Sequence, residues 1–210
     1  MTVALLLAGT ARGQQVVSYF AAIPQSSTDW AQTFQLPGFD SRMGTLTQVK
    51  LSFTGEVWQS LFAENKNATG ANYDLSVATD FALGKSDGTT LLTFPPISLQ
   101  RTGTLGIYDG ALDWAGTSGV TFDQHVSESG IYLDSSLSGY LAGPVIFSAS
   151  TLTAQGLVVS GGNSSTGISA SAAAQLSVEY TCTAIPEPST YAAILGMTAL
   201  GIVTIRRRKT

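Results

Sequence analysis

The chain has 210 residues, of which 11% are charged and 44% are hydrophobic, and its one cysteine is Cys182. This composition excludes a disulfide scaffold and disfavours a disordered chain, which would be poor in apolar residues and rich in charge. One histidine and few clustered bases argue against a zinc enzyme and against a nucleic-acid partner. The length suits one domain with short additional segments.

Residues 1–13 resemble the end of a secretory signal. Val3–Ala8 is apolar, and Ala11 and Gly13 are small residues at the two positions that a signal peptidase inspects. Because no basic region precedes the apolar run, the true translation start is expected upstream of Met1. We expect cleavage after Gly13, and a buried first strand is the alternative.

Residues 14–185 predict an all-β domain. Short segments alternate apolar and polar residues or are rich in strand-forming residues, and turn-forming residues separate them. In chain order the expected strands are Val16–Ala21, Val49–Phe53, Tyr73–Val77, Leu91–Phe94, Thr104–Tyr108, Val120–Phe122, Val145–Ala149 and Ala174–Tyr180. The longest loop is expected at Ser160–Ala170. Together these features predict an antiparallel β-sandwich of the jelly-roll or immunoglobulin-like type.

The body also resembles the choice-of-anchor E family of bacterial domains, over about residues 16–182. The resemblance rests on Leu36–Asp40, on Met43–Gly55 and on the Gly-Gly-Asn stretch at Gly161–Asn163. Family members open with a Leu-Pro-x-Phe-Asp turn that is followed by Gly-Thr-Leu and a strand. Since the family has no established catalytic activity, the resemblance implies export and surface display.

Aromatic side chains offer one candidate binding site in this domain. A sugar-binding platform could form from Trp30, Trp58, Trp114, Tyr73, Tyr108, Tyr132 and Tyr140. Trp114 is the best candidate for an exposed ring, because Asp113 and Gly116 flank it in a loop-like stretch. The alternative is that most of these rings fill the core of the sandwich.

Titratable residues offer weaker candidates. His125 and Asp123 would share one face of a strand, but a solvated histidine is the simpler interpretation. Four acids could supply oxygen ligands for calcium: Asp109, Asp113, Asp123 and Asp134. They lack the spacing of an EF-hand loop, so solvated carboxylates are the alternative. Without a Gly-x-Ser-x-Gly elbow, we assign no catalytic residue and no metal site.

The C-terminal segment has three parts, and it follows Cys182, which we expect to be buried or inert. A Pro-Glu-Pro triplet comes first: Pro186, Glu187 and Pro188. An uncharged apolar stretch, Tyr191–Ile205, then predicts a single transmembrane helix. Four bases close the chain: Arg206, Arg207, Arg208 and Lys209. They should stay cytoplasmic by the positive-inside rule, which places residues 14–185, with their formal charge of −8, on the outside.

Residues 186–210 resemble the PEP-CTERM sorting signal of Gram-negative bacteria. The resemblance implies that an exosortase, a membrane-embedded cysteine protease, recognises the triplet, cleaves near it and releases or transfers the body to the cell exterior. A plain membrane anchor with a Pro-rich stalk is the alternative.

We therefore expect an exported, non-enzymatic protein of the cell surface or extracellular matrix, held in the inner membrane before processing. An exopolysaccharide-binding module with the same delivery is the second interpretation, and a calcium-dependent hydrolase or adhesin is the third.

Overall fold

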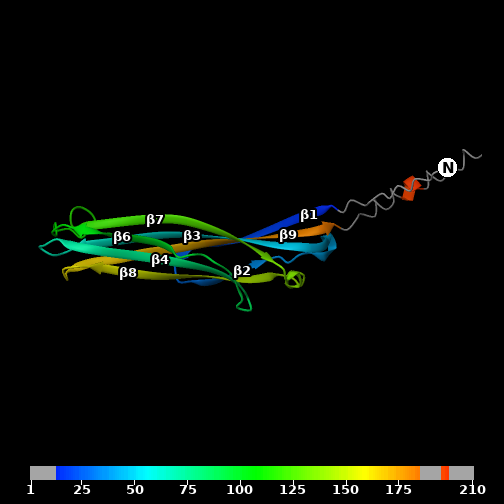
Figure 1. Ribbon diagram of the computed structural model, residues 1–210, viewed down its shortest axis with the longest axis horizontal. Coiled ribbons are helices and arrows are strands. Elements are labelled where there is room, and N and C mark those ends of the chain that lie inside the picture. Colours follow the sequence, from blue (N-terminus) through cyan, green and yellow to red (C-terminus); the bar gives the residue numbers. More distant parts are fainter. Residues whose placement is uncertain (1–12, 185–194, 199–210) are drawn as a thin grey trace, which may run out of the picture.

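The computed structural model describes residues 13–184 and 195–198, and two antiparallel sheets pack into an elongated β-sandwich (Figure 1). The first sheet contains, in spatial order, β1 (Gln14–Ser27), β9 (Ser164–Ala184), β3 (Gly44–Asn65) and β7 (Gly119–Asp134). The second contains β2 (Ala31–Leu36), β8 (Val145–Val159), β4 (Ala71–Lys85), β5 (Thr90–Thr93) and β6 (Ile97–Leu105). Two short 3-10 helices, η1 (Ser41–Met43) and η2 (Leu137–Tyr140), lie in the connections. The expected all-β sandwich is confirmed.

The strand order is that of a jelly roll. β5 and β6 both pair with β4, β6 along Ala71–Thr79 and β5 along Ala82–Gly84, so they follow one another along a single edge. Pro95 and Pro96 separate them, and proline has no backbone N–H to donate to a ladder. Counted as one interrupted strand, β5 and β6 complete two four-stranded sheets between which the chain passes repeatedly, as in jelly rolls.

Alternation of small polar and apolar residues builds the long strands. In β3, Leu51, Phe53, Val57 and Leu61 are fully buried between the sheets, while the even-numbered residues from Ser52 to Ser60 face outward. The strand continues well beyond the alternation that predicted it, because the same inward phase holds from Val49 to Asn65.

Three expectations about strands and loops need correction. β2 was not expected, and Thr104–Tyr108 falls mostly in the loop after β6, which begins at Ile97. The expected loop Ser160–Ala170 is a loop only to Asn163, where Gly161 and Gly162 take positive φ angles of 98° and 91°. Ser164–Ala170 belongs to β9, whose small residues pair in register with the end of β3.

The core between the sheets is divided in two. One cluster surrounds Phe53 and Tyr180, and a smaller one contains Leu61, Leu75 and Leu99. Between them the buried Gln59 of β3 donates hydrogen bonds of 3.0 Å to Thr79 Oγ1 of β4 and to the Ile97 carbonyl of β6. This polar layer links the two sheets where the second sheet is interrupted.

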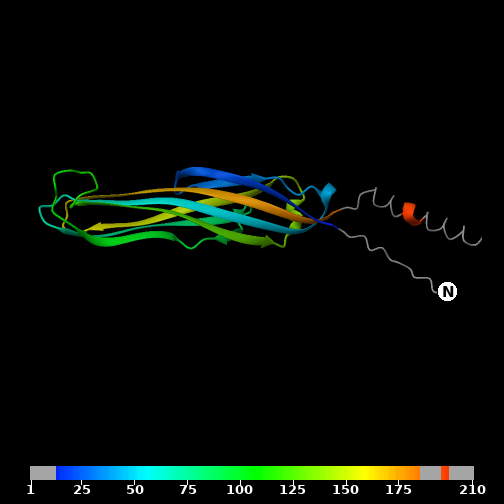
Figure 2. The same ribbon diagram turned by 90° about the horizontal axis from the view of Figure 1, so that it is seen from above.

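Both ends of the sandwich chain emerge at one pole. Gln14 of β1 pairs with Thr183 of β9, and the N–H of Ala184 donates to the carbonyl of Gly13. The β3–β4, β6–β7 and β8–β9 connections lie at the opposite pole (Figures 1 and 2). We call these the terminal pole and the loop pole.

Among residues 13–184 and 195–198, no helix is long and apolar enough to cross a membrane. Residues 195–198 are helical. The remainder of the predicted membrane segment Tyr191–Ile205 lies outside the described residues, as do the signal segment 1–12, the triplet at 186–188 and the basic residues 206–209.

Candidate functional site

The outer face of the first sheet carries a line of rings along β3. Trp58, Ser60, Phe62 and Glu64 occupy alternate positions that point away from the core. Rings from β7 and from the β6–β7 loop join two of them. We call Trp58, Phe62, His125 and Trp114 the aromatic strip; it extends along the half of the sheet that leads to the loop pole.

Trp58 and His125 form the first pair of the strip. They are directly opposed across β3 and β7, and their rings stack with centroids 4.4 Å apart and planes 8° from parallel. His125 Nε2 lies 3.5 Å from Glu56 Oε2, and the His125 side chain is 53% exposed. His125 therefore lies within a strand and packs on an indole, although it still reaches solvent. Asp123 shares its face, as the period of two predicted.

Ser60 and Asp123 lie beside this pair, one step closer to the loop pole. They too are directly opposed across β3 and β7, and Ser60 Oγ donates a 2.6 Å hydrogen bond to Asp123 Oδ1. An open cavity of about 350 Å³ is lined by Trp58, Gln59, Ser60, Asp123, Gln124 and His125. Hydroxyl, carboxylate, imidazole and indole groups thus line one cavity.

Phe62 and Trp114 form the second pair. Their ring centroids are 4.7 Å apart at 61°, an edge-to-face contact. Trp114 comes from the β6–β7 loop and has a φ of 60°, a left-handed conformation that is uncommon outside glycine. Its backbone N–H donates a hydrogen bond to Glu64 Oε2 at 2.9 Å, and its backbone carbonyl accepts one from Thr121 Oγ1 at 3.2 Å. Trp114 is therefore half-buried and held in place by β3 and β7.

Glu64 lies under this loop and is fully buried. Its Oε2 accepts the Trp114 N–H, and its Oε1 has no hydrogen-bond partner among the described residues. The loop passes so close to β7 that a Cβ added at Gly119 would lie 2.3 Å from the Ala115 nitrogen and 2.5 Å from the Trp114 carbonyl carbon. Glycine at this position permits the contact that buries the carboxylate.

Small residues of β9 border the strip on its other side. Trp58, Ser60 and Phe62 are directly opposed by Ser171, Ser169 and Gly167 respectively. A Cβ at Gly167 would lie 2.4 Å from Phe62 Cε2, so the phenyl ring covers this glycine. The aromatic rings consequently project farther from the sheet than the neighbouring serine and glycine residues of β9.

The other residues of the predicted aromatic platform do not join the strip. Tyr140 is buried in the core, Tyr73 packs near Phe122 with centroids 6.0 Å apart, and Trp30 is half-buried against the larger cluster. Tyr132 also packs against that cluster, and Tyr108 lies in the β6–β7 loop. Of the three tryptophans, Trp58 and Trp114 share the outer face of the first sheet.

The four proposed calcium ligands lie in three places. Asp109 and Asp113 stay within the β6–β7 loop, where each accepts a backbone N–H two residues ahead. Asp123 bonds Ser60, and Asp134 ends β7 beside Lys85. Across residues 13–184 and 195–198, no group of three or more His, Cys, Asp or Glu side chains is arranged to hold a metal ion.

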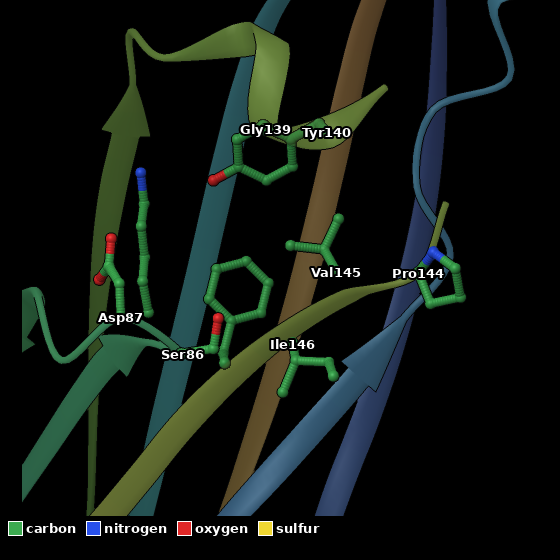
Figure 3. A pocket seen from close by; sticks show the side chains of 9 residues that line it. Ser86, Asp87, Gly139, Tyr140, Pro144, Val145 and Ile146 are labelled. Atoms are coloured by element: carbon green, nitrogen blue, oxygen red, sulfur yellow. The ribbon is translucent and has the colours of Figure 1, made fainter. Parts of the chain in front are cut away.

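A second cavity, of about 270 Å³, lies between the end of β4, η2 and the start of β8 (Figure 3). Tyr140 lines it and donates a 2.7 Å hydrogen bond to Asp134, whose carboxylate also pairs with Lys85. Burial opposes ionisation of Asp134, but the bonds from Lys85, Tyr140 and the Ser136 N–H outweigh it and lower its pKa. Burial and the bond to Asp134 raise the pKa of Tyr140. These groups saturate one another, so the cluster is structural.

Sequence reasoning missed Phe62 and the pairing of Trp58 with His125. The inward phase of Val49, Leu51 and Phe53 places Trp58 and Phe62 on the outer face once β3 is known to continue past Gly55. Cys182, expected to be buried or inert, lies within β9 and is fully buried.

No family model and no curated protein matches this sequence. Similar solved structures include the infectious bursal disease virus Gx strain, with 13% identity over 88% of this chain and a TM-score of 0.25. They also include a T13 particle of that virus, with 14% identity over 90% of the chain and a TM-score of 0.25. The chain spans 41% and 45% of those two chains. A desmodium yellow mottle tymovirus structure matches at 11% identity, over 89% of this chain and 98% of that one, with a TM-score of 0.19.

Proposed function

We propose that this protein is an exported, non-enzymatic module displayed at the cell surface or in the extracellular matrix, and that its C-terminal segment is a sorting signal. In this proposal an exosortase-type membrane protease recognises Pro186, Glu187 and Pro188. Tyr191–Ile205 holds the precursor in the inner membrane, and Arg206, Arg207, Arg208 and Lys209 keep its end cytoplasmic.

The terminal pole is the observation that carries this proposal. Because Gly13 and Ala184 are hydrogen-bonded neighbours, a leader before residue 14 and a membrane segment after residue 185 both attach at one end of the sandwich. The strands run lengthwise from that end, so the loop pole lies as far from the attachment as the fold allows (Figure 2). A module tethered by its terminal pole presents its loops and sheet faces outward.

The surface chemistry fits an extracellular module. The outer face of the first sheet is rich in serine and threonine, and residues 14–185 carry a formal charge of −8. An excess of negative charge keeps a protein soluble and disfavours binding to nucleic acid.

Binding of exopolysaccharide is the second candidate function, and the aromatic strip is the observation that favours it. These aromatic rings lie on an outer sheet face, next to hydroxyl and carboxylate groups, where a sugar chain can reach them. Rings buried in the core could not contact such a ligand.

Replacing the central acid of the triplet tests the sorting proposal. The full chain carrying Glu187→Ala, produced in the native host, should accumulate in the inner-membrane fraction at its unprocessed C-terminal mass. Ser189→Ala, one residue beyond the triplet, is the matched control and should be processed as the parent protein is. Normal processing of Glu187→Ala would overturn the proposal in favour of a plain membrane anchor.

A further inference from the structure

We propose that the aromatic strip is the binding site for one extended, uncharged polysaccharide chain that lies along β3 over several sugar rings. This inference deepens the second candidate function by naming the site and the class of ligand. It depends on the contacts of the strip and is independent of how the C-terminal segment is processed.

The spacing of the rings indicates a ligand of several units. Trp58 and Phe62 are four residues apart on the same face of an extended strand, which separates their Cα atoms by about 13 Å. Ser60, a small residue, lies between them. One sugar ring cannot contact both aromatic residues at that separation, whereas a chain running parallel to β3 can.

The orientation of Trp58 leaves a ring face for the ligand. His125 covers the indole from the β7 side, in a stack 8° from parallel. The opposite indole face is therefore turned toward β9, where the directly opposed residue is Ser171 and the next along that face is Ser169. A pyranose with its apolar C–H face against the indole can rest over these small side chains without a clash.

Polar groups lie beside Ser60, on the β7 side of the path that the chain follows past Trp58. Asp123 Oδ1 accepts a hydrogen bond from Ser60 Oγ, and Asp123 Oδ2 has no hydrogen-bond partner among the described residues. The exposed His125 ring and the Ser60 hydroxyl flank it, in the cavity of about 350 Å³. Carboxylate oxygens form strong hydrogen bonds with hydroxyl donors. Alternation of rings with such groups distinguishes this face from a purely apolar protein-docking patch.

Charge selects among polysaccharides. Asp123 and Glu56 carry negative charge beside the strip, and no lysine or arginine is among the residues of the strip or its directly opposed neighbours on β7 and β9. An acidic chain of uronates would meet like charges without a compensating cation. The occupant is therefore uncharged.

The strip is already rigid. Stacking on His125 fixes Trp58, the bond to Ser60 fixes Asp123, and the contacts of Trp114 with Glu64, Phe62 and Thr121 fix the loop. Binding consequently immobilises few side chains, which lowers its entropic cost.

Titration calorimetry on the full chain, kept in a detergent without a sugar headgroup, tests the proposal. The probes are cellohexaose, laminarihexaose and hexa-N-acetylchitohexaose, each with its disaccharide, and hexameric alginate serves as the acidic comparison. We expect at least one neutral hexasaccharide to bind at least tenfold more tightly than its disaccharide, and alginate not to bind.

Two variants locate the binding. Trp58→Ala should weaken the hexasaccharide at least tenfold, and Asp123→Ala should weaken it about fivefold while leaving the stacked pair intact. Phe20→Ala removes a ring that is 72% exposed on β1, on the outer face of the same sheet but far from the strip, and should leave affinity within twofold. Circular dichroism confirms that each variant is folded.

Three results would overturn the proposal: no binding of any neutral hexasaccharide, equal affinities for Trp58→Ala and Phe20→Ala, or alginate binding as tightly as the neutral probes. A concentration-dependent dimer that Trp58→Ala dissolves would instead assign the strip to a second copy of this chain. None of these results bears on sorting, because Trp58→Ala should be processed normally and Glu187→Ala should bind sugar normally.

Discussion

Lys85 Nζ lies 2.7 Å from Asp134 Oδ2, and this ion pair joins the last residue of β4 to the last residue of β7. The two strands belong to opposite sheets. Because the Asp134 side chain is 3% exposed and that of Lys85 28%, the pair is much drier than a surface salt bridge. Tyr140 donates to the same carboxylate oxygen and thereby attaches η2 to both strands.

Replacing Asp134 with asparagine should destabilise the protein in a pH-dependent way. At pH 7 we expect a loss of about 3 kcal/mol in the free energy of unfolding, because Lys85 and Tyr140 lose a charged partner in a poorly solvated place. The pKa of Asp134 is lower in the folded than in the unfolded state, so its contribution is present above the unfolded value of about 3.9 and is lost as pH falls through the folded value. Urea unfolding at pH 7 and pH 2.5 measures this effect. The stability gap between parent and variant should be smaller at pH 2.5 than at pH 7, and an equal gap at both pH values would refute the assignment.

The hydrogen bond from Gln59 to Thr79 should couple the two residues energetically. Gln59→Leu leaves the Ile97 carbonyl without its buried donor, and Thr79→Val leaves the Gln59 amide short of an acceptor. Each change should cost about 1–3 kcal/mol. The double variant should cost less than the sum, because both partners are then apolar. A double-mutant cycle in urea checks this, and strict additivity would show that this hydrogen bond does not couple the two residues.

Alanine at Gly119 should destabilise the loop pole. The added Cβ would meet the backbone of Ala115 and Trp114, which cannot move without displacing the loop, so a cost of about 1–3 kcal/mol or more is expected. Near-ultraviolet circular dichroism should report the loss of the fixed Trp114 ring. Gly139→Ala is the control: nothing lies within 4 Å of its added Cβ, and its stability should be nearly unchanged. Similar stability of both variants would contradict the close approach of the loop to β7.

Cys182 should be chemically silent in the folded protein. Its side chain is fully buried in β9, between neighbours Gln15 of β1 and Leu46 of β3. Ellman's reagent should therefore react with the native chain only at the rate of its unfolding, and rapidly and stoichiometrically in concentrated urea. Fast reaction under native conditions would show that this end of β9 opens.

The alternation of apolar residues correctly predicted β3, whereas the first part of β9, which is made mostly of small residues, was expected to be a loop. Leu51 and Phe53 identified β3 because their phase marks a buried face. Ser164–Ala170 carries few apolar residues, and tertiary pairing with β3 makes it a strand against its own weak preference. Part of the aromatic strip could be predicted from the sequence. Trp114 was identified from its loop, but its partner Phe62 depends on β3 continuing past Gly55, which local sequence alone does not establish.

The mass of the mature protein tests the central claim, display at the cell surface after removal of both end segments. Intact mass spectrometry of the protein from the surface fraction of its native host reports the removal of both end segments in a single mass. We predict a chain that starts at Gln14 and ends near Pro186–Pro188, without Tyr191–Ile205. A surface protein that retains both Val3–Ala8 and the final Arg206–Lys209 would contradict the account.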